Sequence, residues 1–330
     1  MGDPVVTGAF HWHGGRLDEA RARFGSGSDW LDLSTGINPY PWPGAARLRF
    51  DWQALPAPSA LRALEEAAAA HFGVEPALCC AVPGSEIGLR LLGRLIDLPG
   101  RFMPPCYRTH GAIFANSRPA AADPAGERAA LVIANPNNPD GRILPVPILR
   151  QWLAQQEAAG GWLVVDEAFA DPLPRAGMAG DVAEGRRLVV MRSFGKFFGL
   201  AGVRLGFAIA PPELIAALRG LLGDWPLSAA AIEVGTRAYR DRHWIAATRA
   251  ALPRRAAALD AVLQRNGFAP MGGSPLFRLI DSGRAVALFG RLARCRILTR
   301  PFADNASWLR IGLPPDDAAL ERFDKALADG

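Results

Sequence analysis

Short apolar runs alternate with amphipathic segments through the middle of the chain. Residues 131–134, 162–166, 188–192 and 204–210 are continuously apolar over most of their length. A strand with one solvated face alternates apolar and polar residues, whereas a continuous apolar run is typical of a strand buried on both faces of a largely parallel sheet. The pattern therefore predicts a large α/β domain with a mainly parallel central sheet.

Helical periodicity appears between and after these runs. Residues 59–72 predict a helix with Ser59 as its N-cap and Gly73 as its C-terminal stop, and another helix is expected to open near 145–147. After Pro211 the pattern changes to long helices with a break near Pro253. The end of the chain predicts a smaller α+β domain, with strands at 276–280, 296–299 and 308–312 and a helix near 283–294.

The first 45 residues are rich in Gly, Pro and Trp and predict an irregular arm with one short strand near 30–33. We therefore divide the chain into three parts. These are the N-terminal arm (1–45), which contributes to the small domain, the large domain (46–215) and the small C-terminal domain (216–330).

Composition limits the classes of function. Half of the 330 residues are hydrophobic and 21% are charged, which is typical of a soluble globular protein. No apolar run reaches the roughly 18 residues that span a bilayer, and the N-terminus lacks the pattern of a secretory signal. The four cysteines, Cys79, Cys80, Cys106 and Cys295, show neither metal-site spacing nor a disulfide framework, which favours a reducing cytoplasm.

The net charge of +5 does not indicate a nucleic-acid-binding protein. The arginines are scattered through amphipathic segments and form no basic block, so they predict solvated helix faces. A modest positive surplus also suits a small anionic substrate.

Lysine is almost absent from the chain. Of the 37 lysine and arginine residues only Lys196 and Lys325 are lysines, and Lys325 lies in a charged C-terminal segment. A GC-rich genome explains the scarcity of lysine but not the presence of Lys196. A guanidinium stays protonated in proteins, whereas a desolvated lysine amine can lose its proton and form a Schiff base with a carbonyl. Lys196 is therefore a candidate nucleophile.

Four segments lie at expected strand ends or helix starts, where open α/β sheets bind ligands. They are residues 82–88, 135–141, 166–169 and 193–204. The first is a Gly-Ser turn that offers N–H groups to a phosphate, before an amphipathic helix with apolar residues at Ile87, Leu91, Leu92 and Leu95. The second is a rigid Pro- and Gly-containing turn that can aim an amide at a ligand.

The third segment places the carboxylate of Asp166 at a buried strand end, where it needs a cation. The fourth contains Lys196. Each segment alone is more often structural than functional, but together and in this order they indicate a ligand site.

The motifs resemble those of a known family. Asn-Pro-Asn-Asn-Pro-x-Gly at 135–141, Asp-Glu-Ala-Phe at 166–169 and Ser-Phe-x-Lys-x-x-Gly-Leu-Ala-Gly-x-Arg at 193–204 are similar to motifs of fold-type I enzymes that use pyridoxal 5′-phosphate. The resemblance covers nearly the whole chain and is nearest to the branch of histidinol-phosphate aminotransferases and threonine-phosphate decarboxylases. The segments 13–15 (His-Gly-Gly) and 31–39 resemble the opening of the decarboxylases.

The resemblance implies a role for each matching residue around the cofactor. Lys196 would bind it as a Schiff base and then transfer protons, Asp166 would pair with its ring nitrogen, Asn138 would bind its 3′ oxygen and Tyr107 would stack on its ring. The residues implied around its phosphate are Gly84, Ser85, Glu86, Ser193 and Arg204, of which Ser85 and Glu86 would act through their backbone.

The resemblance also implies substrate ligands. Arg310 would bind the α-carboxylate, with Asn38 beside it. The residues implied near a substrate phosphate are His13, Gly14 and Gly15, with Arg300 and Arg16 as further candidates.

Three positions depart from the family pattern. Phe169 stands where many relatives have Tyr, and Gly195 stands where many have Ser. Leu55 lies where relatives place a Tyr that crosses the dimer interface to the cofactor phosphate. Active sites of this fold are built from two subunits, so the resemblance implies a homodimer.

The resemblance implies decarboxylation of L-threonine O-3-phosphate to (R)-1-amino-2-propanol O-2-phosphate in cobalamin biosynthesis. The alternative is an aminotransferase that acts on a phosphorylated amino acid such as histidinol phosphate, and residue types do not separate the two. A third hypothesis is an idle cofactor-binding module of a regulator. It requires a DNA-binding segment or loss of the lysine, and the sequence shows neither.

Overall fold

The computed structural model describes residues 10–120 and 126–328. The chain forms two compact units. Unit 1 comprises Met1–Tyr40, Pro139–Gly141 and Arg249–Gly330, and unit 2 comprises Pro41–Asn138 and Arg142–Thr248. The first nine residues of the predicted arm lie outside the described residues.

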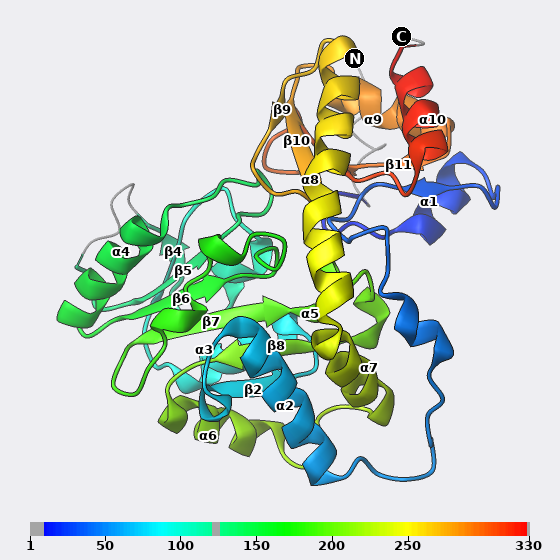
Figure 1. Cartoon of the computed structure of the whole chain (residues 1–330). Helices are drawn as coiled ribbons and strands as arrows, with labels where there is room; N and C mark the ends of the chain where they lie inside the picture. The colour runs from blue at the N-terminus through cyan, green and yellow to red at the C-terminus, as the bar shows by residue number, and fades with distance from the viewer. Residues whose placement is uncertain (1–9, 121–125, 329–330) are drawn as a thin grey trace. The chain divides into compact units, whose positions relative to one another are not determined.

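Unit 2 is built on a seven-stranded sheet (Figure 1). Its strands in spatial order are β2 (Cys79–Val82), β8 (Gly206–Ile209), β7 (Leu188–Ser193), β6 (Trp162–Asp166), β5 (Ala130–Ala134), β3 (Gly100–Phe102) and β4 (Arg118–Pro119). Strand β8 runs antiparallel to β2 and β7, and the other neighbouring strands are parallel. This confirms the predicted α/β class with a mainly parallel sheet.

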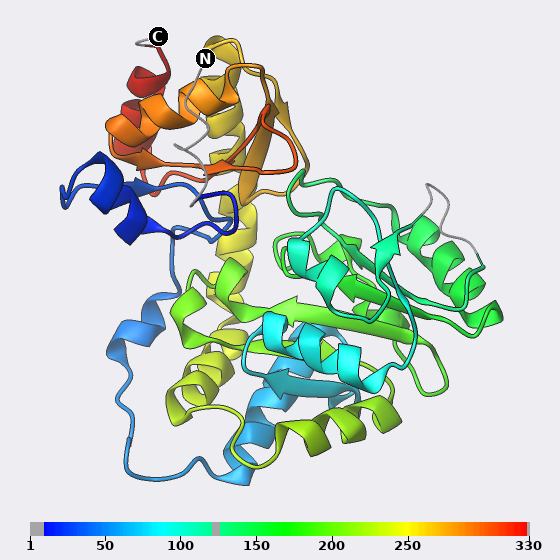
Figure 2. The same cartoon turned by 180° about the vertical axis from the view of Figure 1, so that it is seen from behind.

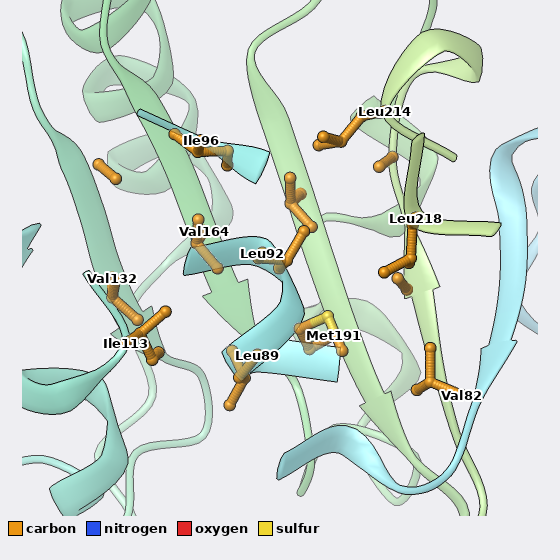
Figure 3. Packing of buried hydrophobic residues seen from close by; sticks show 14 of the residues in the cluster. Val82, Leu89, Leu92, Ile96, Ile113, Val132, Val164, Met191, Leu214 and Leu218 are labelled. Atoms are coloured by element: carbon orange, nitrogen blue, oxygen red, sulfur yellow. The ribbon is translucent and has the colours of Figure 1, made fainter. Parts of the chain in front are cut away.

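Helices cover both faces of this sheet, which explains the continuous apolar runs. Helices α3 (Ser85–Leu95) and α6 (Pro212–Leu222) lie on one face (Figure 2), where Leu89, Leu92 and Leu218 pack against the strands (Figure 3). Helix α4 (Val146–Ala158) packs on the other face through Leu149 and Leu153. Burying each such side chain stabilises the fold by about 1.5–3 kcal/mol.

The helix that follows the exposed loop at 48–57 differs in detail from its prediction. The predicted N-cap, Ser59, is wrong: helix α2 (Pro58–Phe72) has Ala57 as its N-cap, two residues earlier, because proline suits the first helical position. Gly73 ends the helix in the left-handed conformation, as predicted. In α3, Ile87 is 41% exposed and does not belong to the buried face.

Unit 1 contains the predicted small α+β fold. Its four-stranded antiparallel sheet has the order β12 (Arg300–Pro301), β13 (Trp308–Gly312), β10 (Phe277–Asp281) and β9 (Pro270–Met271). In the arm, β1 (Leu31–Asp32) pairs in parallel with β11 (Ile297–Leu298). The helices that lie wholly in this unit are α1 (Leu17–Phe24), α9 (Ala285–Arg294) and α10 (Asp317–Ala328).

The two units do not divide where the sequence analysis placed the end of the large domain, after residue 215. Helices α6 and α7 (Ala229–Arg240) belong to unit 2, because α6 packs on β2 and α3 while α7 packs on α2. The division falls within α8 (Arg242–Arg265), which runs through Pro253 without a break, so the predicted break is wrong.

Short 3-10 turns complete the description at Pro43–Arg47, Pro76–Leu78, Arg108–Ala112, Pro174–Ala176, Ala179–Asp181 and Ala201–Val203. Among the described residues, no helix combines the length and the apolar character needed to cross a membrane.

Candidate active site

Lys196 lies in α5 (Phe194–Phe197), a single turn directly after β7. The phenylalanines of this turn and the one after it are fully buried: Phe194, Phe197 and Phe198. The rings of Phe194 and Phe198 stack at 4.5 Å between centroids. This packing fixes the backbone that carries the lysine, and its Nζ lies 5.7 Å from the centre of the Phe169 ring.

Close packing explains why a glycine, Gly195, precedes the lysine. A Cβ at Gly195 would lie 2.7 Å from the Cα of Ala201, closer than real Cβ atoms approach a backbone. The serine of many relatives therefore does not fit this turn unless the backbone shifts.

The carboxylate of Asp166, at the end of β6, is buried and held on both oxygens. Oδ1 accepts a hydrogen bond from the Ala168 amide (3.1 Å), and Oδ2 lies 3.1 Å from Nε2 of His110. The His110 ring is fully buried, and its Nδ1 has no hydrogen-bond partner among the described residues. We therefore assign the ring proton to Nε2, which donates to Asp166.

The hydroxyl of Tyr107 is held by a carboxylate. It donates to Oε2 of Glu86 (3.0 Å), while Thr109 donates to Oε1 of the same side chain (3.1 Å). Burial raises the pKa of Tyr107 to about 12, so the phenol stays protonated at neutral pH. This arrangement suits a ring that stacks on a ligand rather than one that transfers protons.

A cradle for an anion lies at the start of α3. Gly84 is the N-cap of this helix at φ 87°, and as a glycine it has no side chain to cap the first turn. A Cβ at Gly84 would lie 2.8 Å from Nη2 of Arg204, and one at Gly206 would lie 2.5 Å from the amide nitrogen of Ser85. The Arg204 guanidinium thus lies beside the backbone N–H groups that open α3, an arrangement that favours a phosphate. Ser193, the N-cap of α5, makes no side-chain capping bond.

The 135–141 turn is tied down by two of its three asparagines. Asn135 donates from Nδ2 to the carbonyl of Ala176 (2.9 Å), and its Oδ1 accepts from the amide of Leu144 (2.8 Å). Asn137 donates to the carbonyl of Pro105 (2.8 Å) and so joins this turn to the segment that precedes Tyr107. Asn138, the predicted ligand, is half-buried next to this anchor.

In unit 1 the predicted carboxylate ligand, Arg310, is only 4% exposed. Its Nη2 donates to the carbonyl of Ser34 (2.9 Å), and Arg300 lies opposite it on β12. Burial and the charge of Arg300 lower the pKa of Arg310 to about 9, against the opposing charge of Asp32. Two guanidinium groups beside one carboxylate leave an excess of positive charge, which a bound anion would offset.

Hydrogen bonds connect the His-Gly-Gly segment at 13–15 to Ser34 and, through it, to the end of β1. The Gly15 amide donates to the Ser34 hydroxyl (2.7 Å), and that hydroxyl donates to Asp32 (2.5 Å). A Cβ at Gly14 would lie 2.3 Å from the Ser34 carbonyl oxygen, so a side chain there would displace the backbone. His13 lies exposed beside this close approach.

Three other predicted residues of unit 1 are also placed. Arg300 donates to the carbonyl of Trp12 (3.2 Å), so it lies beside the His13 segment. Asn38 is buried, and its Oδ1 accepts from the Tyr40 amide (3.0 Å). Arg16 forms an ion pair with Glu19 on the adjoining helix turn.

Sequence reasoning missed several residues of these two clusters. They are His110 and Thr109 beside Asp166 and Tyr107, and Asp32, Ser34 and His11 beside Arg310 and Arg300. Burial and the charge of Arg300 lower the pKa of His11. The only available signal was their position in the chain, since His110 follows Tyr107 by three residues and Asp32 and Ser34 lie in the segment 31–39.

A family model described as Aminotransferase class I and II matches residues 110–327. The chain belongs to this family. A threonine-phosphate decarboxylase from Sinorhizobium sp is 39% identical to it, with 99% of each chain covered. A threonine-phosphate decarboxylase from Pseudomonas aeruginosa is 41% identical, with 96% of each covered.

A solved structure is also similar to this fold. The histidinol-phosphate aminotransferase from Sinorhizobium meliloti, in complex with pyridoxal-5′-phosphate, has a TM-score of 0.81 and 20% identity, with 94% of this chain and 93% of that chain covered. This likeness agrees with the predicted fold-type I class.

Proposed function

We propose that the protein is a pyridoxal-phosphate-dependent decarboxylase of L-threonine O-3-phosphate in cobalamin biosynthesis. The observation that carries the proposal is near full-length similarity to two threonine-phosphate decarboxylases, in a chain that retains Lys196 and Asp166 at adjacent strand ends. In the reaction the bond between Cα and the carboxylate breaks, CO₂ leaves and a proton replaces it on Cα. The product, (R)-1-amino-2-propanol O-2-phosphate, keeps the substrate phosphate, and no oxidant or reductant is needed.

The residues of unit 2 fit the cofactor. The cradle formed by Gly84, Ser85 and Arg204 suits its phosphate, because a side chain at position 84 would fill the space beside the guanidinium. The Ser193 hydroxyl and the backbone of Glu86 complete that set, while the Glu86 carboxylate holds Tyr107 against the ring. Asn138 binds the 3′ oxygen.

When bound, pyridoxal 5′-phosphate accepts the electron pair left on Cα as a bond there breaks. Asp166 keeps the ring nitrogen protonated, since a carboxylate favours a nearby positive charge. Lys196 would hold the cofactor covalently, and its amine would deliver a proton to Cα. His110 orients Asp166 through their hydrogen bond.

The residues of unit 1 fit the two anionic groups of the substrate. Arg310 binds the α-carboxylate, for which its planar donor pair is suited, and Asn38 assists. We assign the substrate phosphate to His13, the backbone of Gly14 and Gly15, and Arg300. The hydrogen bond from Arg300 to the carbonyl of Trp12, the residue before His13, supports this assignment.

The aminotransferase alternative uses the same residues, but Lys196 would deliver the proton to the cofactor rather than to Cα. Arg310 does not separate the two reactions, because histidinol phosphate lacks an α-carboxylate but its keto-acid partner, 2-oxoglutarate, carries one. The identities of 39% and 41% over nearly the whole chain favour the decarboxylase.

Replacing His13 with alanine is expected to weaken the binding of phosphorylated substrates more than that of their unphosphorylated analogues. Loss of one charge-assisted hydrogen bond to phosphate costs about 1.5–3 kcal/mol, which corresponds to an increase in KM of about 10- to 150-fold. The KM of L-threonine O-3-phosphate and the inhibition constant of L-threonine are compared in the variant and the natural protein. Equal losses for both compounds would remove His13 from the phosphate site.

We also propose that the protein is a cytoplasmic homodimer. In unit 2, Trp52 is 73% exposed and Leu55 is 66% exposed, and Trp225 and Leu221 are exposed as well. Trp225 has a φ of 52°, and it lines a cavity of about 480 Å³ with Pro56. Apolar surface of this kind is typical of protein–protein contacts.

Sedimentation velocity of the purified protein is expected to give a mass twice that of the chain, which is 35.3 kDa. A sedimenting species with the mass of one chain would contradict the proposed dimer.

The substrate assignment is tested by comparing two reactions of the cofactor-loaded protein. Turnover of L-threonine O-3-phosphate alone is expected to exceed turnover of L-histidinol phosphate with 2-oxoglutarate. The opposite preference would support the aminotransferase alternative.

A further inference from the structure

A buried arginine that the reaction does not use lies four residues before Lys196. Arg192 is on β7, next to Ser193, and its side chain is buried. Neighbouring residues of a strand face opposite sides of the sheet. Met191 packs in the cluster beneath α3, so Arg192 faces the other side of the sheet.

The guanidinium binds two buried carboxylates of the turn that follows β6. Nη1 donates to Oε2 of Glu167 (2.6 Å), and Nη2 donates to Oδ1 of Asp171. His71 of α2 also contacts Oδ1 of Asp171 through Nε2 (2.9 Å). The guanidinium carbon lies 4.7 Å from the centre of the Phe72 ring, so this cluster joins β7, α2 and the 166–171 turn.

Stability alone does not explain this cluster. Replacing a buried ion pair with apolar residues of similar volume is often neutral or stabilising, because desolvating the charges is costly. Burial raises the pKa of Glu167, against the charge of Arg192. Burial also acts to raise the pKa of Asp171, but Arg192 and His71 outweigh it and lower that pKa.

Short backbone segments connect this cluster to Asp166 and to Lys196. Glu167 follows Asp166 directly, and its amide donates to the Met191 carbonyl (2.8 Å). The Glu167 carboxylate also accepts a hydrogen bond from the Met178 amide. Arg192 therefore fastens the residue after Asp166 to the strand that leads into the Lys196 turn.

We propose that Arg192 is a positioning residue, which through Glu167 and Asp171 fixes the separation between the Asp166 carboxylate and the Lys196 amine. The inference rests on the proposed cofactor role of those two side chains. A planar guanidinium can hold two carboxylates at a fixed angle, whereas a lysine ammonium is a point charge on a flexible stem.

The test compares Arg192→Lys with the natural protein, both loaded with cofactor. Arg192→Lys keeps the positive charge but loses the pair of hydrogen bonds to Glu167 and Asp171. We expect kcat to fall about 10- to 100-fold, with a smaller change in KM. The pH midpoint of the colour change of the lysine-bound cofactor is expected to rise by about one unit. If Asp166 is displaced, its carboxylate stabilises the protonated ring nitrogen less. The ring then carries less positive charge, so the lysine nitrogen is protonated more easily and its pH midpoint rises.

Arg278→Lys is the matched control. Arg278 of unit 1 is a buried arginine that binds Asp260 with two donors (2.5 and 2.9 Å). Its replacement is expected to lower the unfolding temperature without moving the pH midpoint. If Arg192→Lys does not fold, Glu167→Gln is used, with the same expected direction and a smaller size.

An unchanged midpoint in Arg192→Lys, together with a lower unfolding temperature, would overturn the proposal and leave Arg192 a structural residue. The proposed function fails separately, because natural protein without a lysine-bound cofactor would show no such midpoint at all.

Discussion

Replacing Lys196 with alanine is expected to abolish turnover and the visible absorbance of the lysine-bound cofactor. In the proposed reaction the amine is both the covalent attachment point and the proton donor to Cα, so its loss should reduce kcat by at least about 10³-fold. Lys196→Arg should behave in the same way, because a guanidinium keeps the charge but does not act as a nucleophile. The measurement is the absorbance spectrum of the purified variant with added cofactor, followed by single-turnover kinetics.

The chain offers a matched control in its other lysine. Lys325 pairs with Glu321 at 2.9 Å, and its side chain is exposed. Lys325→Ala is expected to leave the spectrum and the rate unchanged. If Lys196→Ala retained both the absorbance band and turnover, the assignment of the attachment point would be wrong.

Replacing Asp166 with asparagine is expected to reduce kcat by about 10²- to 10³-fold, the range seen when one preorganised electrostatic contact is removed. The amide has nearly the same shape as the carboxylate but does not keep the ring nitrogen protonated. Cofactor should still attach to Lys196, while the pH midpoint of its colour change should rise. Spectral titration and steady-state kinetics of the variant measure both effects.

Two comparisons make this result specific. Asp181→Asn removes a carboxylate that pairs with Arg150 outside the active-site cluster (2.8 Å), and it should change neither quantity. His110→Gln alters the hydrogen bond to Asp166 and should shift the midpoint in the same direction by less. A normal kcat in Asp166→Asn would show that this carboxylate is not the partner of the ring nitrogen.

Some of the fold could be predicted because single strands carry their own signal. Residues 162–166 and 308–312 form strands with the predicted bounds, since both are apolar runs that the sheet buries. Strands β3 and β4 have only three and two residues, which is too short for a pattern. Pro253 predicted a break, but α8 continues through it, because local propensity does not decide the path of a helix held by tertiary packing.

Some residues of the candidate site could likewise be predicted from the sequence, and others could not. Lys196, Asp166 and Arg204 could be predicted as site residues because each lies in a short motif whose spacing is visible in the chain. His110 and Arg192 were missed because their partners are fixed only by the fold. His110 meets Asp166 across 56 residues, and Arg192 meets Glu167 across 25 residues. Neither pair has a spacing that a sequence pattern could show.

The most direct test of the proposed reaction is a product assay of the cofactor-loaded protein with L-threonine O-3-phosphate, run with and without 2-oxoglutarate. The account predicts release of CO₂ in both reactions, at the same rate, with a phosphorylated amino alcohol as the other product. Formation of glutamate that requires 2-oxoglutarate, with no CO₂ from the substrate, would contradict it and make the protein an aminotransferase.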